Sequence, residues 1–361
     1  MKIMSIVGAR PQFIKAAAFS RVSAKRRGIR EILVHTGQHF DTSMSDVFFD
    51  TMDIPRPAYN LAVNSLSHGA MTGRMLEKIE ALVMKEKPDV VLVYGDTNST
   101  LAGALAARKL HVKVGHVEAG LRSFNMEMPE EVNRILTDRI SDYLYCPTPT
   151  AVENLHREGF DRFDAEIVRT GDIMLDAALY YAAQSSRKAD LPPLPPGKFA
   201  LCTVHRAENT DSPERMDAIL EGLRKVHGDL PVVMPLHPRT RRVLSDRGVD
   251  PRLWMLPPVG YFEMLELLKN CSLVLTDSGG LQKEAYFFHK HCVTLRDQTE
   301  WTELVEGGFN VLARADAEDI YLKAGEMLEK ESDFTRGLYG TGRAAEEILD
   351  HLEGEIGRAH V

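Results

Sequence analysis

The segment 276–284, Thr-Asp-Ser-Gly-Gly-Leu-Gln-Lys-Glu, combines residue types that bind phosphate and sugar groups. It follows a short apolar run typical of a β-strand and opens a helical pattern. Glycine lets a backbone approach a ligand closely and a helix N-terminus presents free N–H groups, so Ser278, Gly279 and Gly280 predict an anion site. Glu284 lies one turn into the helix, where a carboxylate could hold a ribose diol. The segment therefore predicts a nucleotide-linked ligand, although an ordinary turn between strand and helix would use the same residues.

Other charged and polar side chains also follow predicted strands. Arg10 lies on the turn after the first strand and Lys15 one helical turn later, where both could contact a phosphate. Asp96 follows the third strand, and Glu118 ends the fourth. The remaining polar residues at strand ends and helix starts are Glu130, Glu131, Asn133, Arg134, His205, Arg206, Asn209 and His237. Because the carboxyl ends of parallel strands meet at one edge of a sheet, we expect these groups to lie together.

Most of these residues also have a purely structural interpretation. Asp96 suits a helix N-cap, and acidic residues such as Glu130 and Glu131 are favoured in the first turn of a helix. His205 suits a core histidine with a satisfied hydrogen bond. Glu118, at the end of a buried-looking strand, is harder to explain by packing. Packing does not require acids, a histidine and basic residues to share one edge of two facing sheets, so together they indicate a functional site.

The residue types indicate acid–base chemistry. Burial and like charge raise the pKa of a carboxyl group, which lets a Glu act as an acid or a base near neutral pH. The chain has no His-Glu-x-x-His metal spacing, no Gly-x-Ser-x-Gly elbow and no Walker-type loop. The residues therefore predict chemistry on a nucleotide-linked compound without a metal or a covalent nucleophile. They leave glycosyl transfer, elimination and epimerisation open.

The elements that must position these residues alternate along the chain. Short β-branched runs are followed by amphipathic helical stretches, a pattern typical of parallel sheets with helices on both faces. A proline-rich stretch interrupts this pattern, which then restarts. We therefore expect an α/β protein with two doubly wound Rossmann-like domains, 1–184 and 198–340, joined by the linker 185–197. Their strand ends would face each other across a ligand cleft.

The composition is that of a soluble globular protein, with 44% hydrophobic and 27% charged residues in a chain of 361. A net charge of −8 argues against a general nucleic-acid binder. No apolar run approaches the roughly 18 residues of a membrane span, and the segment 1–7 is too short for a signal peptide. The four cysteines form no Cys-x-x-Cys pair, which predicts buried reduced thiols and a cytoplasmic location.

The motifs occur in a fixed order, at 8–15, 95–97, 116–122, 129–134, 205–209, 277–284 and 295–300. In these motifs the sequence resembles the non-hydrolysing UDP-N-acetylglucosamine 2-epimerase family, over nearly the whole chain. The resemblance implies a fold of the glycosyltransferase-B type, with a UDP-binding second domain and a last helix, 341–361, that packs back on the first domain. It also implies a homodimer and no cofactor, neither NAD nor a metal.

The family resemblance assigns a reaction to the residues. A base removes the C2 proton of the sugar while UDP leaves C1, and UDP then adds back to the glycal as a proton returns to the opposite face of C2. The resemblance implies that the acid–base and leaving-group residues are Asp96, Glu118, Glu130 and His205. It leaves open which of them is the base and which is the acid.

The resemblance also implies how the nucleotide is held. Arg10 and Lys15 match positions near the diphosphate, Ser278 and the glycines 279–280 match its backbone anchor, and Glu284 matches the ribose contact. Further motif residues that the resemblance places at the site are Glu131, Arg134, Arg206, Asn209 and Arg296. Many UDP-N-acetylglucosamine enzymes of the family also bind a second substrate molecule as activator. The residues that match parts of that site are Gln38 and His237, whereas Asp41 and the segment 65–67 do not match it.

Departures from the commonest family pattern point to one branch. They are Ala9, Gln12 and the segments 123–128 and 301–302. These variants resemble the branch that acts on UDP-2,3-diacetamido-2,3-dideoxy-glucuronic acid in the synthesis of bacterial O-antigen. The resemblance thus leaves two sugars open, N-acetylglucosamine, with N-acetylmannosamine as the C2-inverted product, and this diacetamido uronic acid.

The extra carboxylate of such a sugar needs a donor or a cation, for which Arg122 and Arg296 are the candidates. Three other functions on the same architecture stay open, of which a non-catalytic nucleotide sensor is the most remote. A glycosyltransferase would share the nucleotide site but would not need Asp96, Glu118 and Glu130 together. A hydrolysing epimerase would release UDP and the free sugar.

Overall fold

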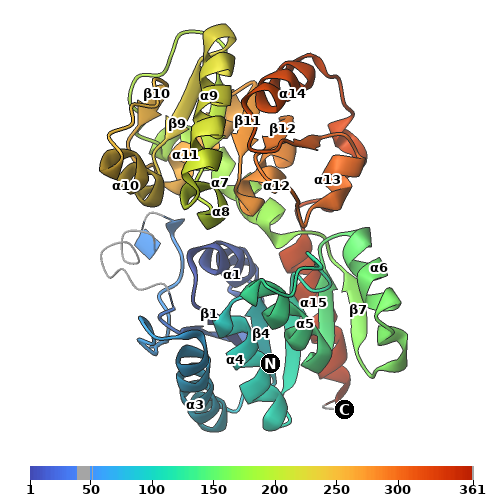
Figure 1. Cartoon of the computed structure of the whole chain (residues 1–361). Coiled ribbons are helices and arrows are strands. Elements are labelled where there is room, and N and C mark those ends of the chain that lie inside the picture. Colours follow the sequence, from blue (N-terminus) through green and yellow to red (C-terminus); the bar gives the residue numbers. More distant parts are fainter. Residues whose placement is uncertain (39–48, 51, 360–361) are drawn as a thin grey trace. The chain divides into compact units, whose positions relative to one another are not determined.

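The computed structural model of the chain describes residues 1–38, 49–50 and 52–359, which form two compact units (Figure 1). Unit 1 comprises Met1–Ala177 and Gly337–Val361, and unit 2 comprises Ala178–Arg336. Each unit contains one parallel sheet with helices that connect successive strands. The predicted fold class, with two doubly wound α/β domains, is therefore confirmed.

Helix α7 (Ile173–Lys188) runs through the boundary between the units. No Gly or Pro interrupts this helix, which explains why it continues past residue 184, the predicted end of the first domain. The predicted linker 185–197 therefore begins inside a helix, and it belongs to unit 2. The last helix, α15 (Ala344–Ala359), begins after the predicted start at 341, and residues 360–361 lie outside the described part of the chain.

Unit 1 contains a seven-stranded sheet with the order β3-β2-β1-β4-β5-β6-β7, in which all neighbours pair in parallel. Its strands are β1 (Lys2–Val7), β2 (Arg30–His35), β3 (Tyr59–Asn60), β4 (Val90–Tyr94), β5 (Lys113–Val117), β6 (Tyr143–Cys146) and β7 (Glu166–Arg169). The direction of strand order reverses between β1 and β4, and open α/β sheets bind ligands at such a switch point. The turns after these two strands carry Arg10 and Asp96.

The helices of unit 1 cover both faces of this sheet (Figure 1). They are α1 (Arg10–Ser23), α3 (His68–Glu86), α4 (Asn98–Lys109), α5 (Pro129–Ile140), α6 (Pro149–Arg157), the 3₁₀ turn Phe160–Arg162 and α15. Local sequence signals mark where helices begin. Thr97 caps α4 by accepting a hydrogen bond from the backbone N–H of Thr100, and α5 begins with a proline. The last helix, α15, returns to α1, where Arg26 donates to Glu353 at 2.8 Å.

Unit 2 contains a six-stranded sheet with the order β10-β9-β8-β11-β12-β13, again with parallel neighbours. Its strands are β8 (Ala200–Thr203), β9 (Val232–Pro235), β10 (Trp254–Leu256), β11 (Leu273–Thr276), β12 (Cys292–Thr294) and β13 (Asn310–Leu312). Its helices are α8 (Ala207–Thr210), α9 (Pro213–Asp229), α10 (Pro238–Asp246), α11 (Tyr261–Asn270), α12 (Gly279–Phe287), α13 (Thr302–Glu306), α14 (Ala317–Glu329) and the 3₁₀ turn Phe334–Arg336. Strand order reverses between β8 and β11, whose ends carry His205 and Ser278.

Apolar side chains between sheet and helices form the core of each unit. In unit 1, Met4, Ile6, Val91 and Val93 pack against Ala-rich α4. In unit 2, separate clusters cover the two faces of the sheet. Strands buried on both faces explain the continuous apolar runs in the sequence. Within the described residues, no helix has the length and hydropathy needed to cross a membrane.

Candidate active site

Lys15 of α1 and Glu118, directly after β5, form a buried ion pair in unit 1. The two residues are 103 positions apart, and the strand order β1-β4-β5 brings the end of β5 toward α1. Glu118 has a φ of +76°, in the left-handed region that residues other than glycine seldom adopt. Strained backbone of this kind is typical of functional sites.

Asp96 and Glu131 share the guanidinium group of Arg134, which donates to both carboxylates. Glu131 is fully buried, and it also accepts the backbone N–H groups of Ser123 and Phe124, each at 2.9 Å. Arg134 thereby holds Asp96 at the end of β4. Glu131 anchors the loop that precedes α5.

Glu130, in the first turn of α5, has an exposed side chain. Nearby, Asn133 donates to the backbone oxygen of Asp96 at 3.0 Å and to Asn98 Oδ1 at 3.2 Å. A hollow of about 500 Å³ opens beside these two amides, and its lining consists of His68, Gly69, Thr72, Gly73, Asn98, Pro129, Val132 and Asn133. Unit 1 therefore has open space next to the groups that hold Asp96.

Arg10 lies at the start of α1, and Gln38, in the segment after β2, contacts the start of α4. Arg10 begins α1 with an exposed side chain, after the turn that closes β1. Gln38 Oε1 accepts hydrogen bonds from the backbone N–H of Ser99 at 3.1 Å and from its hydroxyl at 2.7 Å. Both side chains therefore lie at the same end of the sheet as Asp96 and Glu118.

Gln12, one of the departures from the family pattern, does not face a ligand. Its side chain is 2% exposed, and its Oε1 accepts the N–H groups of Gly8 and Ala9. Its Nε2 donates to the carbonyl of Tyr94 at 2.6 Å and to the hydroxyl of Thr97 at 3.0 Å. Gln12 therefore connects the turns after β1 and β4. This buried position does not support the expectation that Gln12 lies around the sugar pocket.

His116 and Asp138 form a buried pair beneath Glu118 that the sequence did not single out as functional. His116 Nδ1 lies 2.6 Å from Asp138 Oδ1, and both side chains are fully buried. Burial would raise the pKa of Asp138, but the charges of His116 and Arg122 and their hydrogen bonds lower it below its usual range. His116 lies in the motif 116–122, whereas nothing in the sequence marks Asp138.

Arg122 was one candidate partner for a substrate carboxylate. Its guanidinium is 1% exposed and donates to both oxygens of Glu158, at 2.6 and 2.8 Å, and to Asp138 at 2.7 Å. A guanidinium buried among these carboxylates cannot meet a substrate, so this interpretation was wrong.

In unit 2, Asp277 organises the residues after β8. Its carboxylate is fully buried and accepts the backbone N–H groups of His205 and Arg206, at 2.9 Å each, and the side-chain amide of Asn209 at 3.1 Å. Burial lowers the pKa of His205 below its usual range; Arg206 acts in the same direction, and Asp277 opposes both. The ring of His205 stacks on that of His237, with centroids 4.9 Å apart.

The start of α12 is the predicted anion site. Ser278 caps the helix by accepting the N–H of Leu281. A Cβ at Gly279 would lie 2.3 Å from Glu300 Oε1, whereas a Cβ at Gly280 would have no neighbour within 4 Å. A side chain at the first position would therefore displace the carboxylate of Glu300, and the second position borders open space. Glu284, one turn later, accepts a hydrogen bond from the hydroxyl of Tyr261 at 2.9 Å.

Arg296, the second candidate for a substrate carboxylate, is almost fully buried in unit 2. It donates to Glu300 at 2.9 Å, and its Nε lies 3.6 Å from Glu208 Oε1. Its observed role is to neutralise Glu300 beside the start of α12.

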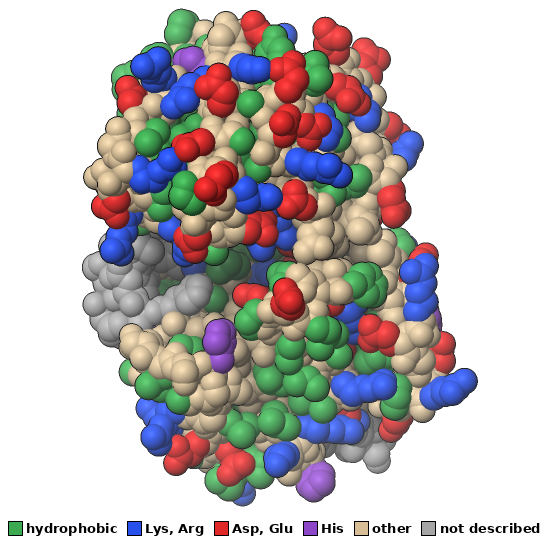
Figure 2. Space-filling model, in the orientation of Figure 1, with side chains coloured by type: hydrophobic (Ala, Val, Ile, Leu, Met, Phe, Trp, Pro, Cys, Tyr) green, Lys and Arg blue, Asp and Glu red, His purple; other side chains and the backbone are tan. Residues whose placement is uncertain are grey.

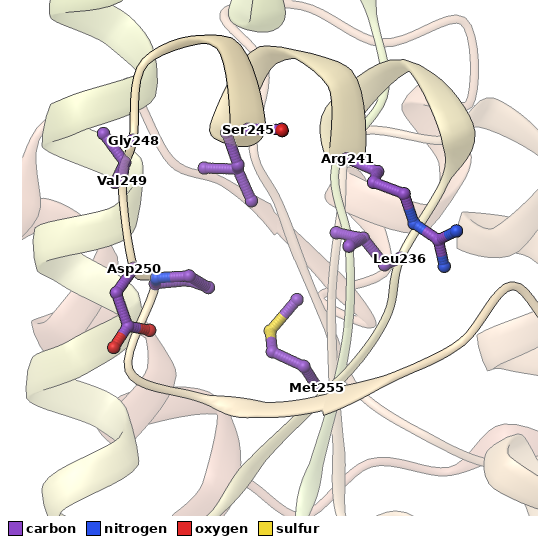
Figure 3. Close-up of a pocket in the computed structure, with 9 residues that line it drawn as sticks. Leu236, Arg241, Ser245, Gly248, Val249, Asp250 and Met255 are labelled. Atoms are coloured by element: carbon purple, nitrogen blue, oxygen red, sulfur yellow. The ribbon is translucent and has the colours of Figure 1, made fainter.

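A separate hollow of about 430 Å³ in unit 2 contains none of the predicted site residues (Figure 3). It is lined by Leu236, Arg241, Leu244, Ser245, Gly248, Val249, Asp250, Pro251 and Met255. The candidate site therefore depends on the strand-end residues, which form one group in each unit.

Comparisons with known proteins show which sequences and structures this chain resembles. A family model described as UDP-N-acetylglucosamine 2-epimerase matches residues 22–353. A UDP-2,3-diacetamido-2,3-dideoxy-D-glucuronate 2-epimerase of Pseudomonas aeruginosa is 54% identical over 98% of this chain and 99% of its own. The crystal structure of Methanocaldococcus jannaschii UDP-GlcNAc 2-epimerase in complex with UDP-GlcNAc and UDP matches with a TM-score of 0.85 and 40% identity, over 98% of this chain and 100% of that one. A glycosyltransferase from Rickettsia africae, 14% identical with a TM-score of 0.56 over 98% of each chain, shares the fold.

Proposed function

The chain belongs to the UDP-N-acetylglucosamine 2-epimerase family of isomerases, and from this membership we propose that it inverts C2 of a UDP-2-acetamido sugar without hydrolysing it. The observation that carries the proposal is the pair of carboxylates in unit 1, Glu118 beside Lys15 and Asp96 beside Arg134. Asp96 comes after β4, at the switch point of the sheet, and Glu118 comes after β5, the neighbouring strand.

In the proposed reaction, a carboxylate takes the C2 proton as the C1–O bond breaks. The electrons of the C–H bond form the C1=C2 double bond of a glycal, and the electrons of the C1–O bond leave with UDP. A phosphate oxygen of UDP then attacks C1, and a proton reaches the opposite face of C2. We propose Asp96, Glu118, Glu130 and His205 as the acid–base and leaving-group residues, as the resemblance implies. Acid–base groups typically supply ~10²–10⁴-fold in rate.

Unit 2 is proposed to hold UDP. The start of α12, with Ser278, Gly279 and Gly280, offers N–H groups and a helix dipole to the diphosphate. Arg206, near Gly279, adds positive charge where negative charge develops on the leaving UDP. Glu284 is proposed to bind the ribose. This assignment is supported by the structure of the Methanocaldococcus relative, which is in complex with UDP-GlcNAc and UDP.

The proposed sugar is 2,3-diacetamido-2,3-dideoxy-glucuronic acid, and the proposed pathway is the synthesis of a bacterial surface polysaccharide. The 54% identity to the Pseudomonas enzyme, against 40% to the Methanocaldococcus enzyme, supports this sugar. The loop 123–128 differs from the commonest family pattern, and Glu131 anchors it beside Asp96. In this loop the side chain of Phe124 is 75% exposed, and its backbone has a φ of +57°.

A homodimer in the cytoplasm completes the proposal. On unit 1, apolar side chains gather over α4 and α5 (Figure 2), and near them Phe124, Met126 and Leu136 are exposed, as on a surface that a second copy would cover. All four cysteines are buried free thiols, which suits a reducing compartment. Light scattering coupled to size exclusion would measure the mass of the assembly, and a monomer would contradict the dimer.

Incubation with a UDP-sugar in deuterated water tests the reaction. We expect deuterium at C2 while UDP stays attached, because the glycal has no hydrogen at C2 and the group that returns a proton to C2 exchanges with solvent. Free UDP with a free sugar would indicate a hydrolysing epimerase. A lack of exchange with every UDP-sugar would indicate a glycosyltransferase or a non-catalytic nucleotide sensor.

The choice of sugar has its own test. We expect kcat/KM to be higher for UDP-2,3-diacetamido-2,3-dideoxy-glucuronic acid than for UDP-N-acetylglucosamine, since a site built for a carboxylate is left unpaired without it. Equal or higher kcat/KM with UDP-N-acetylglucosamine would reject this sugar and leave the 2-epimerase function standing.

A further inference from the structure

The imidazole of His116 lies between two oxygen acceptors in the core of unit 1. Its Nδ1 is 2.6 Å from Asp138 Oδ1, and its Nε2 is 2.7 Å from the carbonyl oxygen of Gly95. A carbonyl accepts hydrogen bonds but cannot donate them, so Nε2 carries a hydrogen. Nδ1 faces the carboxylate of Asp138, which also accepts hydrogen bonds. The ring therefore connects Asp138 to the backbone of Gly95.

The network extends beyond this pair. Asp138 Oδ2 accepts the N–H of Gly120 at 3.2 Å and a hydrogen bond from Arg122 at 2.7 Å, and Arg122 in turn binds Glu158. The ring of His116, two carboxylates and a guanidinium thus form one connected network in or at the edge of the core. Stability alone does not require such an arrangement, because apolar residues of similar volume often stabilise a core as well or better.

The network fixes two turns. Gly95 is held on both sides: its N–H donates to Val117 O at 3.0 Å, and its carbonyl accepts from His116. The carbonyl belongs to the peptide that leads into Asp96, so the ring of His116 sets the plane of that peptide. Glycine is needed here, since φ is +63°.

The second turn carries Glu118. Gly120, whose φ is +78°, is tied to Asp138, and the N–H groups of Glu118 and Ala119 both reach Tyr145 O at 3.1 Å. The two turns touch, because a Cβ on Gly95 would lie 3.4 Å from Glu118 Oε2. One buried network therefore sets the distance between the two proposed acid–base carboxylates.

We propose that His116 is a positioning residue, which acts through the carbonyl of Gly95 to hold Asp96 in register with Glu118, and this role rests on the epimerase function proposed above. His116 contacts no substrate in this role. Its effect is on the geometry of the two carboxylates, and misplacement by about 1 Å can cost on the order of 10²-fold in rate.

Two amide variants separate the two contacts of the ring. In His116→Gln, the side-chain nitrogen is as many bonds from Cβ as Nε2 and can donate to Gly95. In His116→Asn, the nitrogen takes the place of Nδ1 and can donate only toward Asp138. We expect His116→Asn to lower kcat by roughly 10–100-fold with KM and UDP affinity unchanged, and His116→Gln to recover most of that loss.

The matched control is His156→Asn. His156 pairs with Asp161 at 2.7 Å on the exposed surface of unit 1, so the same substitution removes a His–Asp contact away from the site. We expect it to leave kcat unchanged. Thermal unfolding of all three variants shows whether a loss of kcat follows a loss of stability, which would mark His116 as merely structural.

Other outcomes overturn the inference. If His116→Asn and His116→Gln have equal kcat, whether normal or reduced, the Gly95 contact does not matter for rate. If His116→Asn is the more active variant, the contact with Asp138 matters instead. Should both variants fail to fold, the isosteric Asp138→Asn provides the test, and wild-type kcat in that variant contradicts the role of the network.

A crystal structure of His116→Asn separates this inference from the proposed function. We expect the Gly95–Asp96 peptide to rotate and the bond between Asp96 and Arg134 to change. An unmoved peptide rejects the positioning role whatever the enzyme does. If the wild-type protein exchanges no C2 proton, the epimerase function fails, and the structure alone decides whether His116 positions the turn.

Discussion

Unit 1 and unit 2 have the same doubly wound architecture but treat charge at their strand ends differently. In unit 1, carboxylates at the candidate site are paired with cations, as Glu118 is with Lys15. In unit 2, the buried carboxylate of Asp277 accepts backbone N–H groups, and the side chain of His205 stays 33% exposed. The first arrangement suits proton transfer by carboxylates, and the second suits the binding of an anion by basic side chains and a helix start.

The difference teaches that one fold can serve two tasks by the choice of strand-end residues. It also leads to a clear expectation. Substitutions of the unit 1 carboxylates Asp96 and Glu118 should change the rate of C2 exchange with little effect on UDP binding. Substitutions of Glu284 or at the start of α12 in unit 2 should change UDP affinity first.

The largest expected effect is that of Glu118→Gln in unit 1. We expect kcat to fall by roughly 10²–10⁴-fold, because the amide cannot exchange a proton in the reaction. UDP affinity, measured by calorimetry, should stay the same. The control is Glu153→Gln, since Glu153 is an exposed partner of Arg157 on α6. Near-normal turnover in Glu118→Gln, or a large loss of UDP affinity, would break the division of tasks between the units.

In unit 2, Glu284→Ala should act on binding. We expect UDP affinity to fall by about 1.5–3 kcal/mol, the usual contribution of a hydrogen bond to a charged group. Calorimetry with UDP alone measures this change. Tyr261→Phe removes the hydroxyl that donates to Glu284 but keeps the carboxylate, so its effect should be smaller. Unchanged UDP affinity in Glu284→Ala would remove the ribose assignment.

The starts of α12 and α15 differ in the negative group that they meet, and this difference can be tested by the pH dependence of stability. The start of α12 is proposed to meet the diphosphate, whereas the start of α15 already meets Asp176, which accepts the N–H groups of Ala344 and Ala345 at 3.1 and 2.8 Å. Burial raises the pKa of Asp176 to about 6 despite these bonds. The folded state therefore binds this proton more tightly than the unfolded state.

The sign of the effect follows from that difference. The stability that Asp176 contributes in its protonated form is present at low pH and is lost as pH rises from about 4 through 6. Between these values, wild-type protein should lose on the order of 1–3 kcal/mol relative to Asp176→Asn. Urea unfolding of both proteins at several pH values measures the difference. Parallel stability curves would contradict the raised pKa.

The smallest effect is expected at surface ion pairs, where the units should not differ. Arg157 pairs with Glu153 in unit 1 and Arg242 with Asp246 in unit 2, each at i,i+4 on an exposed helix face. We expect Arg157→Ala and Arg242→Ala each to change the free energy of unfolding by less than about 0.5 kcal/mol. A loss of more than about 1 kcal/mol at either pair would show that surface charge, too, distinguishes the units.

The sequence alone predicted both sheets, because β-branched runs and amphipathic helices repeat with periods that local physics sets. It also predicted that a helix begins at Ser278 and its glycines, since a helix start depends on neighbouring residues. The sequence did not show that α7 continues from unit 1 into unit 2, because the proline-rich stretch that marked the predicted linker begins only after this helix.

Only the tertiary structure decided which charges meet. Glu118 finds Lys15 across 103 positions, and His116 finds Asp138 and Gly95, because the strand order β1-β4-β5 brings their turns together. The same packing turned Gln12 inward and enclosed Arg122 among carboxylates, although the sequence had suggested that both bore on the choice of sugar. A buried charge must find a partner wherever the chain brings one, and spacing along the sequence does not contain that information.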